Sequence, residues 1–521
     1  MLIPSGPAGQ YGVISDVNPT EIPMNAWSAS ENMRFPEGYA EKIGGYRSLW
    51  NGAEVSPYFL ATVRPLTGEA FWVYAGAEKV YAYDSAHNEI TRVSGLYTSN
   101  AWQGGVMNGL LYLNNGVDKP QVWSPANNTQ KLIDLPNWPA TARAATIRSF
   151  KNFMVALDVT KASTRDPRLV KWSHPAPVGT YPVSWDETDP TKDAGEYSLS
   201  ESEGVNIDCI PLRSVNVIYK DDSIWAMAYV GGNDIFAFDN LFRNVGIMAK
   251  DCAVEFQKGK HLVFARDDVI IHDGQTIEPI LRAKMRRRIY NSINSVHTDN
   301  SFVTINPANQ EAWICWPENG HVYPNKALIW NWRSNTTGVR DIPEVASIGL
   351  GIADISAGDD NWNSDETIWD ESSAEWGQST ANPSQTRLVM ATPEGDHLHG
   401  IVPDVNNFNG TDFTAKLERT GIGIPFRENL PPDFGSKKYC TEIWPRITGT
   451  IGGIVQIRIG AHDTFHEEPK WGEWKNYVIG TTQKINVTTG GRLLAISFQS
   501  TTAISWKLHG YSLEVIPIGE Y

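Results

Sequence analysis

The chain has 521 residues, of which 41% are hydrophobic, so it is long enough for two or three domains with sizeable cores. Its net charge of −15 argues against wholesale wrapping of nucleic acid and favours basic or neutral partners. No apolar run approaches the ~20 residues that span a bilayer. The first residues lack the basic and apolar pattern of a signal peptide, so we expect synthesis in a cytoplasm and no membrane-spanning segment.

Residues 1–50 are rich in turn-forming proline and glycine and are predicted to be an irregular docking segment. After them, one pattern recurs six times. Each copy is a short apolar or alternating run that closes on an aromatic ring or histidine followed by Asp, Ser or Asn. The copies are Lys79–Asp84, Pro120–Ser124, Arg168–Ser173, Asp234–Asp239, Asp268–Asp273 and Lys326–Asn331.

The spacing of this repeat predicts a degenerate β-propeller over residues 51–345. The closing rings are Tyr83, Trp123, Trp172, Phe238, His272 and Trp330. They lie roughly 40, 49, 66, 34 and 58 residues apart, against about 40–45 residues for a four-stranded blade. We therefore expect an all-β fold with about six blades, and a polar insertion at 176–206 that forms a loop on one rim.

One segment breaks the β pattern and carries an unusual charge. Ile280, Met285, Ile289 and Ile293 are near helical spacing, which predicts a helix over about 280–292. Its polar face holds five basic residues, Arg282, Lys284, Arg286, Arg287 and Arg288. Three interpretations stay open: a channel that meets phosphate without sequence readout, an ionic contact within the chain or with a neighbouring subunit, and a solvated face.

The last third of the chain falls into two parts. Residues 346–411 are acidic and punctuated by tryptophan, and we expect connecting loops there. From residue 412 to 521 alternating strands return, which predicts a separate C-terminal β-sandwich.

Residue patterns of an enzyme are missing. The chain has no Gly-x-Ser-x-Gly and no Walker loop, and its four cysteines form no Cys-x-x-Cys pair. We expect no catalytic, cofactor-binding or metal-binding residues, and we expect buried, reduced thiols at Cys209, Cys252, Cys315 and Cys440.

Several stretches, taken in order, resemble the nozzle or tail-hub proteins of short-tailed bacteriophages, a group that includes tail tubular and tail stabilisation proteins. The matching stretches are Ile22–Trp27, Asn32–Phe35, Gly38, Lys42–Tyr46, Asp222–Gly231, Asp234–Phe238, Gln310–Pro317, Ala327–Trp332, Pro445–Gly449, Gly491–Arg492 and Trp506–Tyr511. Each is an aromatic, glycine or turn pattern that β proteins share, and their order carries the resemblance.

The resemblance implies a structural protein of the virion tail, made in the host cytoplasm, and not an enzyme. Such proteins form a homohexameric ring that docks on a tail adaptor above and on a tip, needle or fibre below. Double-stranded DNA passes through the channel without sequence specificity. The alternative, from another class, is a glycan-binding or glycan-cleaving propeller similar to a tail spike.

Overall fold

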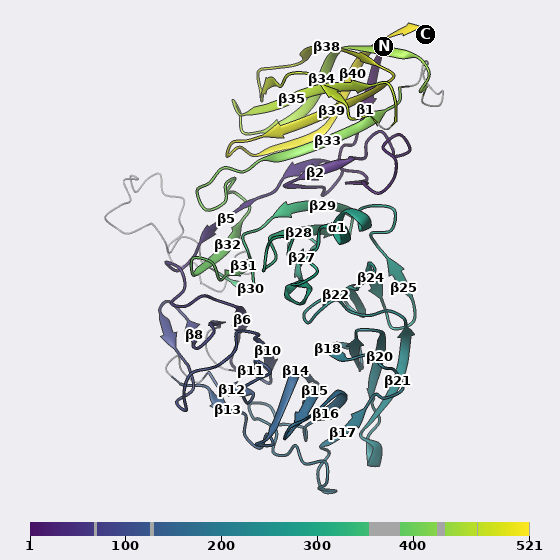
Figure 1. The fold of residues 1–521 in the computed structure, drawn as a ribbon. Helices are drawn as coiled ribbons and strands as arrows, with labels where there is room; N and C mark the ends of the chain where they lie inside the picture. The colour runs from purple at the N-terminus through teal and green to yellow at the C-terminus, as the bar shows by residue number, and fades with distance from the viewer. Residues whose placement is uncertain (67–69, 126–129, 354–385, 425–432, 466, 520–521) are drawn as a thin grey trace, which may run out of the picture.

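A computed structural model describes the chain except residues 67–69, 126–129, 354–385, 425–432, 466 and 520–521. The fold is all-β, with a propeller of seven four-stranded sheets and a sandwich of two six-stranded sheets (Figure 1). Within the described ranges, no helix is long and apolar enough to cross a bilayer.

Every blade is an antiparallel meander whose first strand is the innermost. Blade one is β6 (Phe59–Val63), β7 (Phe71–Ala75), β8 (Val80–Tyr83) and β9 (His87–Glu89). Blade two is β10 (Gln103–Met107), β11 (Leu110–Asn114), β12 (Gln121–Trp123) and β13 (Ile133–Asp134). Blade three is β14 (Ala142–Phe150), β15 (Phe153–Lys161), β16 (Thr164–Trp172) and β17 (Gly195–Ser198). Blade four is β18 (Asn206–Leu212), β19 (Val215–Lys220), β20 (Ser223–Tyr229) and β21 (Phe236–Arg243).

The remaining blades complete the ring. Blade five is β22 (Ala253–Gln257), β23 (Lys260–Phe264), β24 (Val269–His272) and β25 (Ile277–Pro279). Blade six is β26 (Phe302–Asn306), β27 (Glu311–Trp316), β28 (Lys326–Asn331) and β29 (Thr336–Asp341). Blade seven is β30 (Ser347–Ile352), β31 (Thr386–Thr392), β32 (His397–Val402) and β5 (Gly45–Ser48). The innermost strands contact one another in turn around the whole ring, from β6 to β30 and back to β6.

The second strand of a blade is covered on both faces by the neighbouring blades, and its sequence reflects this. All residues of β11 and of β27 are buried, so these strands are near-continuous apolar runs and do not alternate. Trp313 and Leu113, at the centres of such runs, are almost fully buried.

Blade seven differs from the expected domain boundaries. Three of its strands come from residues 346–411, where connecting loops were expected, and the fourth, β5, comes from residues 1–50. β5 pairs with β32 in register, with Tyr46 opposite Ile401. The ring is therefore closed by a strand some 350 residues earlier in the chain. Most of the acidic, tryptophan-rich stretch lies outside the described residues.

The six-fold repeat in the sequence correctly predicted most of the blades seen in the structure. Five of the six closing rings lie on the third strands β8, β12, β16, β24 and β28. Phe238 instead lies on β21, the fourth strand of blade four, where it pairs with Met227. Part of the expected insertion at 176–206 is also strand, because Gly195–Ser198 is the outer strand of blade three.

The C-terminal sandwich takes strands from both ends of the chain. One sheet has the order β3 (Met33–Arg34), β4 (Ala40–Lys42), β40 (Trp506–Gly519), β34 (Lys437–Gly449) and β38 (Ile485–Gly491), with β1 (Leu2–Ser5) also on β40. The other has β2 (Ala29–Glu31), β33 (Ala415–Ile422), β39 (Leu493–Ser500), β35 (Ile454–His462) and β36 (Lys470–Trp471), with β37 (Lys475–Val478) also on β35. Residues 412–521 thus form a sandwich as expected, completed by four short strands from residues 1–50.

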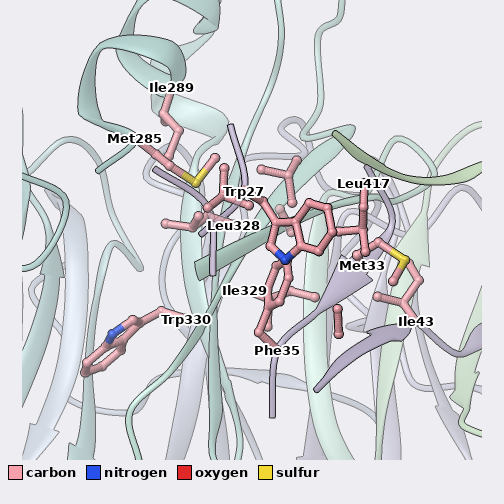
Figure 2. Close-up of a cluster of buried hydrophobic side chains, with 14 of the residues drawn as sticks. Trp27, Met33, Phe35, Ile43, Met285, Ile289, Leu328, Ile329, Trp330 and Leu417 are labelled. Carbon is pink, nitrogen blue, oxygen red and sulfur yellow. The ribbon is translucent and has the colours of Figure 1, made fainter. Parts of the chain in front are cut away.

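Residues 1–50 also fill the junction between the two domains. Figure 2 shows Trp27, Met33 and Phe35 packed between Leu328 of blade six and Leu417 of the sandwich, and all five side chains are buried. One continuous hydrophobic core therefore runs from the propeller into the sandwich. Relative domain motion is expected unless the interface is large and apolar, so this shared apolar core opposes a hinge between the two domains.

Helices are few in the described part of the chain. They are α1 (Arg286–Ser292) and two short 3-10 turns, η1 (Gly232–Asp234) and η2 (Thr298–Asn300). All four cysteines are buried and free, as predicted. Burial raises the pKa of the Cys209 thiol to about 12, which keeps it protonated at neutral pH.

Candidate functional site

The basic segment lies on the connection from β25 to β26, that is, from the outer strand of blade five to the inner strand of blade six. In Figure 1, α1 lies beside blade six on the side that faces the sandwich. The four apolar residues that predicted the helix, Ile280, Met285, Ile289 and Ile293, are all buried in the main core. The apolar pattern therefore identified the inner face of this segment correctly.

The helix itself is shorter than the predicted 280–292. Ala283 adopts a positive φ of 60°, in the left-handed region that a helix interior excludes. The carbonyl of Lys284 accepts hydrogen bonds from the backbone amides of Ser15 and Asp16, at 2.7 and 2.9 Å. A segment from the other end of the chain thus crosses at this point, and the helix begins only at Arg286.

Asp16 also caps the helix, although it is 271 residues away from Arg287. Its carboxylate accepts the backbone amides of Arg287 at 2.7 Å and Arg288 at 3.4 Å. The local N-cap position, Met285, offers no side-chain acceptor. The carboxylate satisfies two otherwise unpaired amides and adds favourable charge at the positive end of the helix.

The five basic side chains form no ion pair within 4 Å among the residues that the structure describes. Lys284 donates to the carbonyl of Asn335 at 2.9 Å, and Arg286 donates to the carbonyl of Asp267. Burial lowers the pKa of Lys284, with Glu278 opposing the shift. Arg282, Arg286, Arg287 and Arg288 are exposed. The intramolecular version of the ionic-contact interpretation is therefore limited to longer-range attraction, in which Glu278 acts on Lys284, Arg288 on Glu31, and Arg282 and Arg286 on Asp268.

Arg288 borders a small polar cavity of about 230 Å³ at the junction of the two domains. Glu31, Glu318 and Lys326 also line it. Burial raises the pKa of Glu31 and nearby Asp341 adds to the rise, while the positive charges of Lys326, Lys416 and Arg288 oppose it. The cavity is too small for a nucleic-acid groove, so the outward-facing arginines are the ones available to a partner.

An ion-pair network fixes the junction beside this segment. Arg34 on β3 contacts Glu41 at 3.0 Å and the buried Glu311 of blade six at 3.3 Å. Lys507 on β40 reaches Glu41 at 3.0 Å. Although burial opposes the charge of Arg34, the two carboxylates outweigh it and raise the pKa of the guanidinium. The side chain of Asn32 adds hydrogen bonds to Asp341 and to the Thr414 carbonyl.

Sequence patterns did not identify Asp16, Asn32 or Arg34 as junction residues. Their partners across the junction, such as Arg287, Thr414 and Glu311, are about 270 to 380 residues away, and no local sequence motif predicts such a contact. Within the described ranges, no group of three or more His, Cys, Asp or Glu side chains is placed to hold a metal ion.

No protein-family model matches the chain, and comparison with curated protein sequences finds no match. Among solved structures, the chain is similar to the WD40 β-propeller domain of Doa1, with a TM-score of 0.35 and 10% identity over 68% of this chain and 96% of that one. It is similar to the AfRom2 CNH domain, with a TM-score of 0.35 and 8% identity over 69% and 97%. A third is PorZ, a surface component of the type-IX secretion system of Porphyromonas gingivalis, with a TM-score of 0.34 and 10% identity over 84% and 46%. At this level of similarity, the propeller assignment rests on the sheet topology of the chain itself.

Proposed function

We propose that this chain is a structural subunit of a bacteriophage tail, in the nozzle or hub of a short-tailed phage. In this proposal several copies form a ring that docks on a tail adaptor and encloses a channel for double-stranded DNA. The ring is located in the virion. The proposal starts from the resemblance in the sequence, and one structural observation supports it.

That observation is the position of five of the resembling stretches in the fold. Ile22–Trp27, Asn32–Phe35 and Lys42–Tyr46 belong to the segment that fills the domain junction. Gln310–Pro317 and Ala327–Trp332 cover β27 and β28 of the adjoining blade six. Stretches separated by about 300 residues thus meet around one interface, while Asp222–Gly231 and Asp234–Phe238 lie in blade four.

The junction suits a ring subunit on physical grounds. A subunit that holds packaged DNA under load must not hinge between its domains. The continuous core and the Arg34–Glu311 contact oppose such a hinge. The net charge of −15 also suits a conduit, because walls of like charge do not retain passing phosphates.

The purified full-length chain tests the proposal. Native mass spectrometry and negative-stain imaging should show a closed ring of defined size. An epitope-tagged copy should be found by immunogold labelling at the tail of intact virions. A chain that stays monomeric at all concentrations and is absent from virions would contradict the proposal. Release of sugar from host polysaccharide by the purified chain would instead support the glycan-active alternative.

A further inference from the structure

An open groove lies on the outer rim of the propeller, where blades three and four meet. It has a volume of about 890 Å³. Its walls come from three segments, the β16–β17 connection around 187–194, the outer strand β17, and the turn η1 with the start of β21. The polar insertion that the sequence predicted on one rim thus forms one side of a groove.

Aromatic side chains form the apolar part of the groove. Tyr197 on β17 stacks on Phe238 of β21, with ring centroids 4.9 Å apart and an interplanar angle of 9°. Trp172 and Phe236 pack edge to face at 5.3 Å and are buried, whereas Tyr197 is 42% exposed. The buried Trp172 and Phe236 thus support the Tyr197–Phe238 pair, which presents a flat surface to a partner.

The rest of the groove is acidic. Five carboxylates and one lysine line it, namely Glu187, Asp189, Asp193, Glu196, Asp234 and Lys192. Glu187 and Glu196 are held by Lys161 and Lys171. Asp234 has no ion pair within 4 Å in the described chain, and Asp193 has only His174 at 3.9 Å. A flat aromatic surface beside free carboxylates is the environment that a guanidinium group prefers.

We propose that the exposed arginines of the basic segment, Arg282 and Arg287 foremost, dock into this groove on a second copy of the chain. This inference rests on the proposed ring. Both surfaces belong to every copy, and Arg282, Arg287 and Asp234 form no ion pair within 4 Å in the described chain. Since α1 is fixed beside blade six and the groove lies between blades three and four, the two cannot meet within one chain. A contact between different patches of identical subunits is head-to-tail, the type that forms a ring when the rotation between copies closes.

Charge reversal on both sides tests the pairing. The side chains of Arg282 and Arg287 have no hydrogen bond or ion pair within the described chain, so R282E/R287E should leave the fold intact. The groove variant is D193R/D234R. Each should abolish the oligomer seen by native mass spectrometry, and a chain that carries all four substitutions should recover it. The control is K258E/K260E, which reverses two exposed lysines on the β22–β23 hairpin and should assemble as the wild type does.

Thermal melting of every variant confirms that the monomer folds. If wild-type rings form and either two-site variant still assembles, the pairing is wrong while the proposed ring remains. If both variants dissociate but the four-site variant does not recover, the two surfaces do not meet and the inference also fails. A wild-type chain that never assembles and is also absent from virions removes the proposed function itself. A glycan would be the occupant of the groove instead if two results were found together. An added oligosaccharide would protect Tyr197 from chemical modification, and R282E/R287E would assemble as the wild type does.

Discussion

A buried histidine pair between blades four and five predicts that the fold weakens in acid. The hydroxyl of Tyr219 lies 2.6 Å from Nδ1 of His261 and 2.8 Å from Nε2 of His272, and all three residues are buried. Nε2 of His261 lies 2.9 Å from the carbonyl of Pro211, so it must carry the proton. Tyr219 therefore donates to His261 and accepts from His272, and both imidazoles are neutral.

Protonation of either ring is unfavourable, for a different reason in each. A proton on Nδ1 of His261 would remove the acceptor of the Tyr219 hydroxyl. A proton on Nδ1 of His272 would bury a charged donor that has no hydrogen-bond partner in the described chain. Burial lowers the pKa of His261 from 6.5 to about 4, and burial together with the charge of His261 lowers that of His272 to about 3. The pKa values of both histidines are lower in the folded chain than in the unfolded chain. The stability that the neutral pair contributes is therefore fully present above pH 6.5 and is lost as the pH falls below it. At pH 5 the titration of each histidine lowers the free energy of unfolding by about 2 kcal/mol. Because the two titrations are coupled, the pair together lowers it by ~2–4 kcal/mol.

Urea denaturation at pH 7.5, 6 and 5 measures this loss. Replacement of both rings, H261Q/H272Q, should lower the stability at pH 7.5 but make its decline toward pH 5 shallower by about 2–4 kcal/mol. H297Q, which replaces a partly exposed histidine, should keep the wild-type decline. Equal declines for the wild type and H261Q/H272Q would refute the reasoning, because the pair would then not be the groups that titrate.

Three further predictions concern the domain junction. D16A removes the long-range cap of α1 and should cost about 1 kcal/mol in urea denaturation, against little change for D239A, an exposed aspartate on β21. R34M removes the ion-pair partner of the buried Glu311 and should lower the free energy of unfolding by about 3–5 kcal/mol. Part of this loss should be recovered in R34M/E311Q. No recovery would show that the ion pair is not the cause. Deletion of residues 1–50 removes β1 to β5 and should yield insoluble chain, and a soluble product with a cooperative unfolding transition would contradict the topology.

The sequence predicted what depends on local pattern. The propeller, the sandwich, the buried thiols and the apolar face of Ile280, Met285 and Ile289 follow from alternation, spacing and composition, which neighbouring residues determine. The repeat identified third strands because a ring at the end of such a strand packs against a neighbouring blade, as Trp123 does against Phe71 of blade one and Trp330 against Phe256 of blade five. Both tryptophans are buried.

What the sequence did not predict depends on contacts between distant segments. Blade seven combines β5 with strands 300 residues later and separates β30 from β31 by a long polar stretch, so no repeat of fixed length marks it. The predicted helix begins six residues before the observed one. The cause is the hydrogen bonding of Ser15 and Asp16 to the carbonyl of Lys284, which no pattern near residue 284 predicts. The candidate basic residues were identified by composition, whereas their neighbours Asp16 and Glu31 were not.

The position of residues 1–50 also constrains how the chain could assemble. The segment has no core of its own, which is why docking was expected, but it gains its order within the same chain, from β1 on β40 to β5 on β32. These strands find their partners in the same chain, on β40, β33 and β32, so their order does not depend on a neighbouring copy. In the proposed ring, contacts between copies would use outer surfaces of the propeller. The arginines around α1 and the groove between β17 and β21 are two such surfaces of opposite charge, and this is why charge reversal there is the decisive experiment.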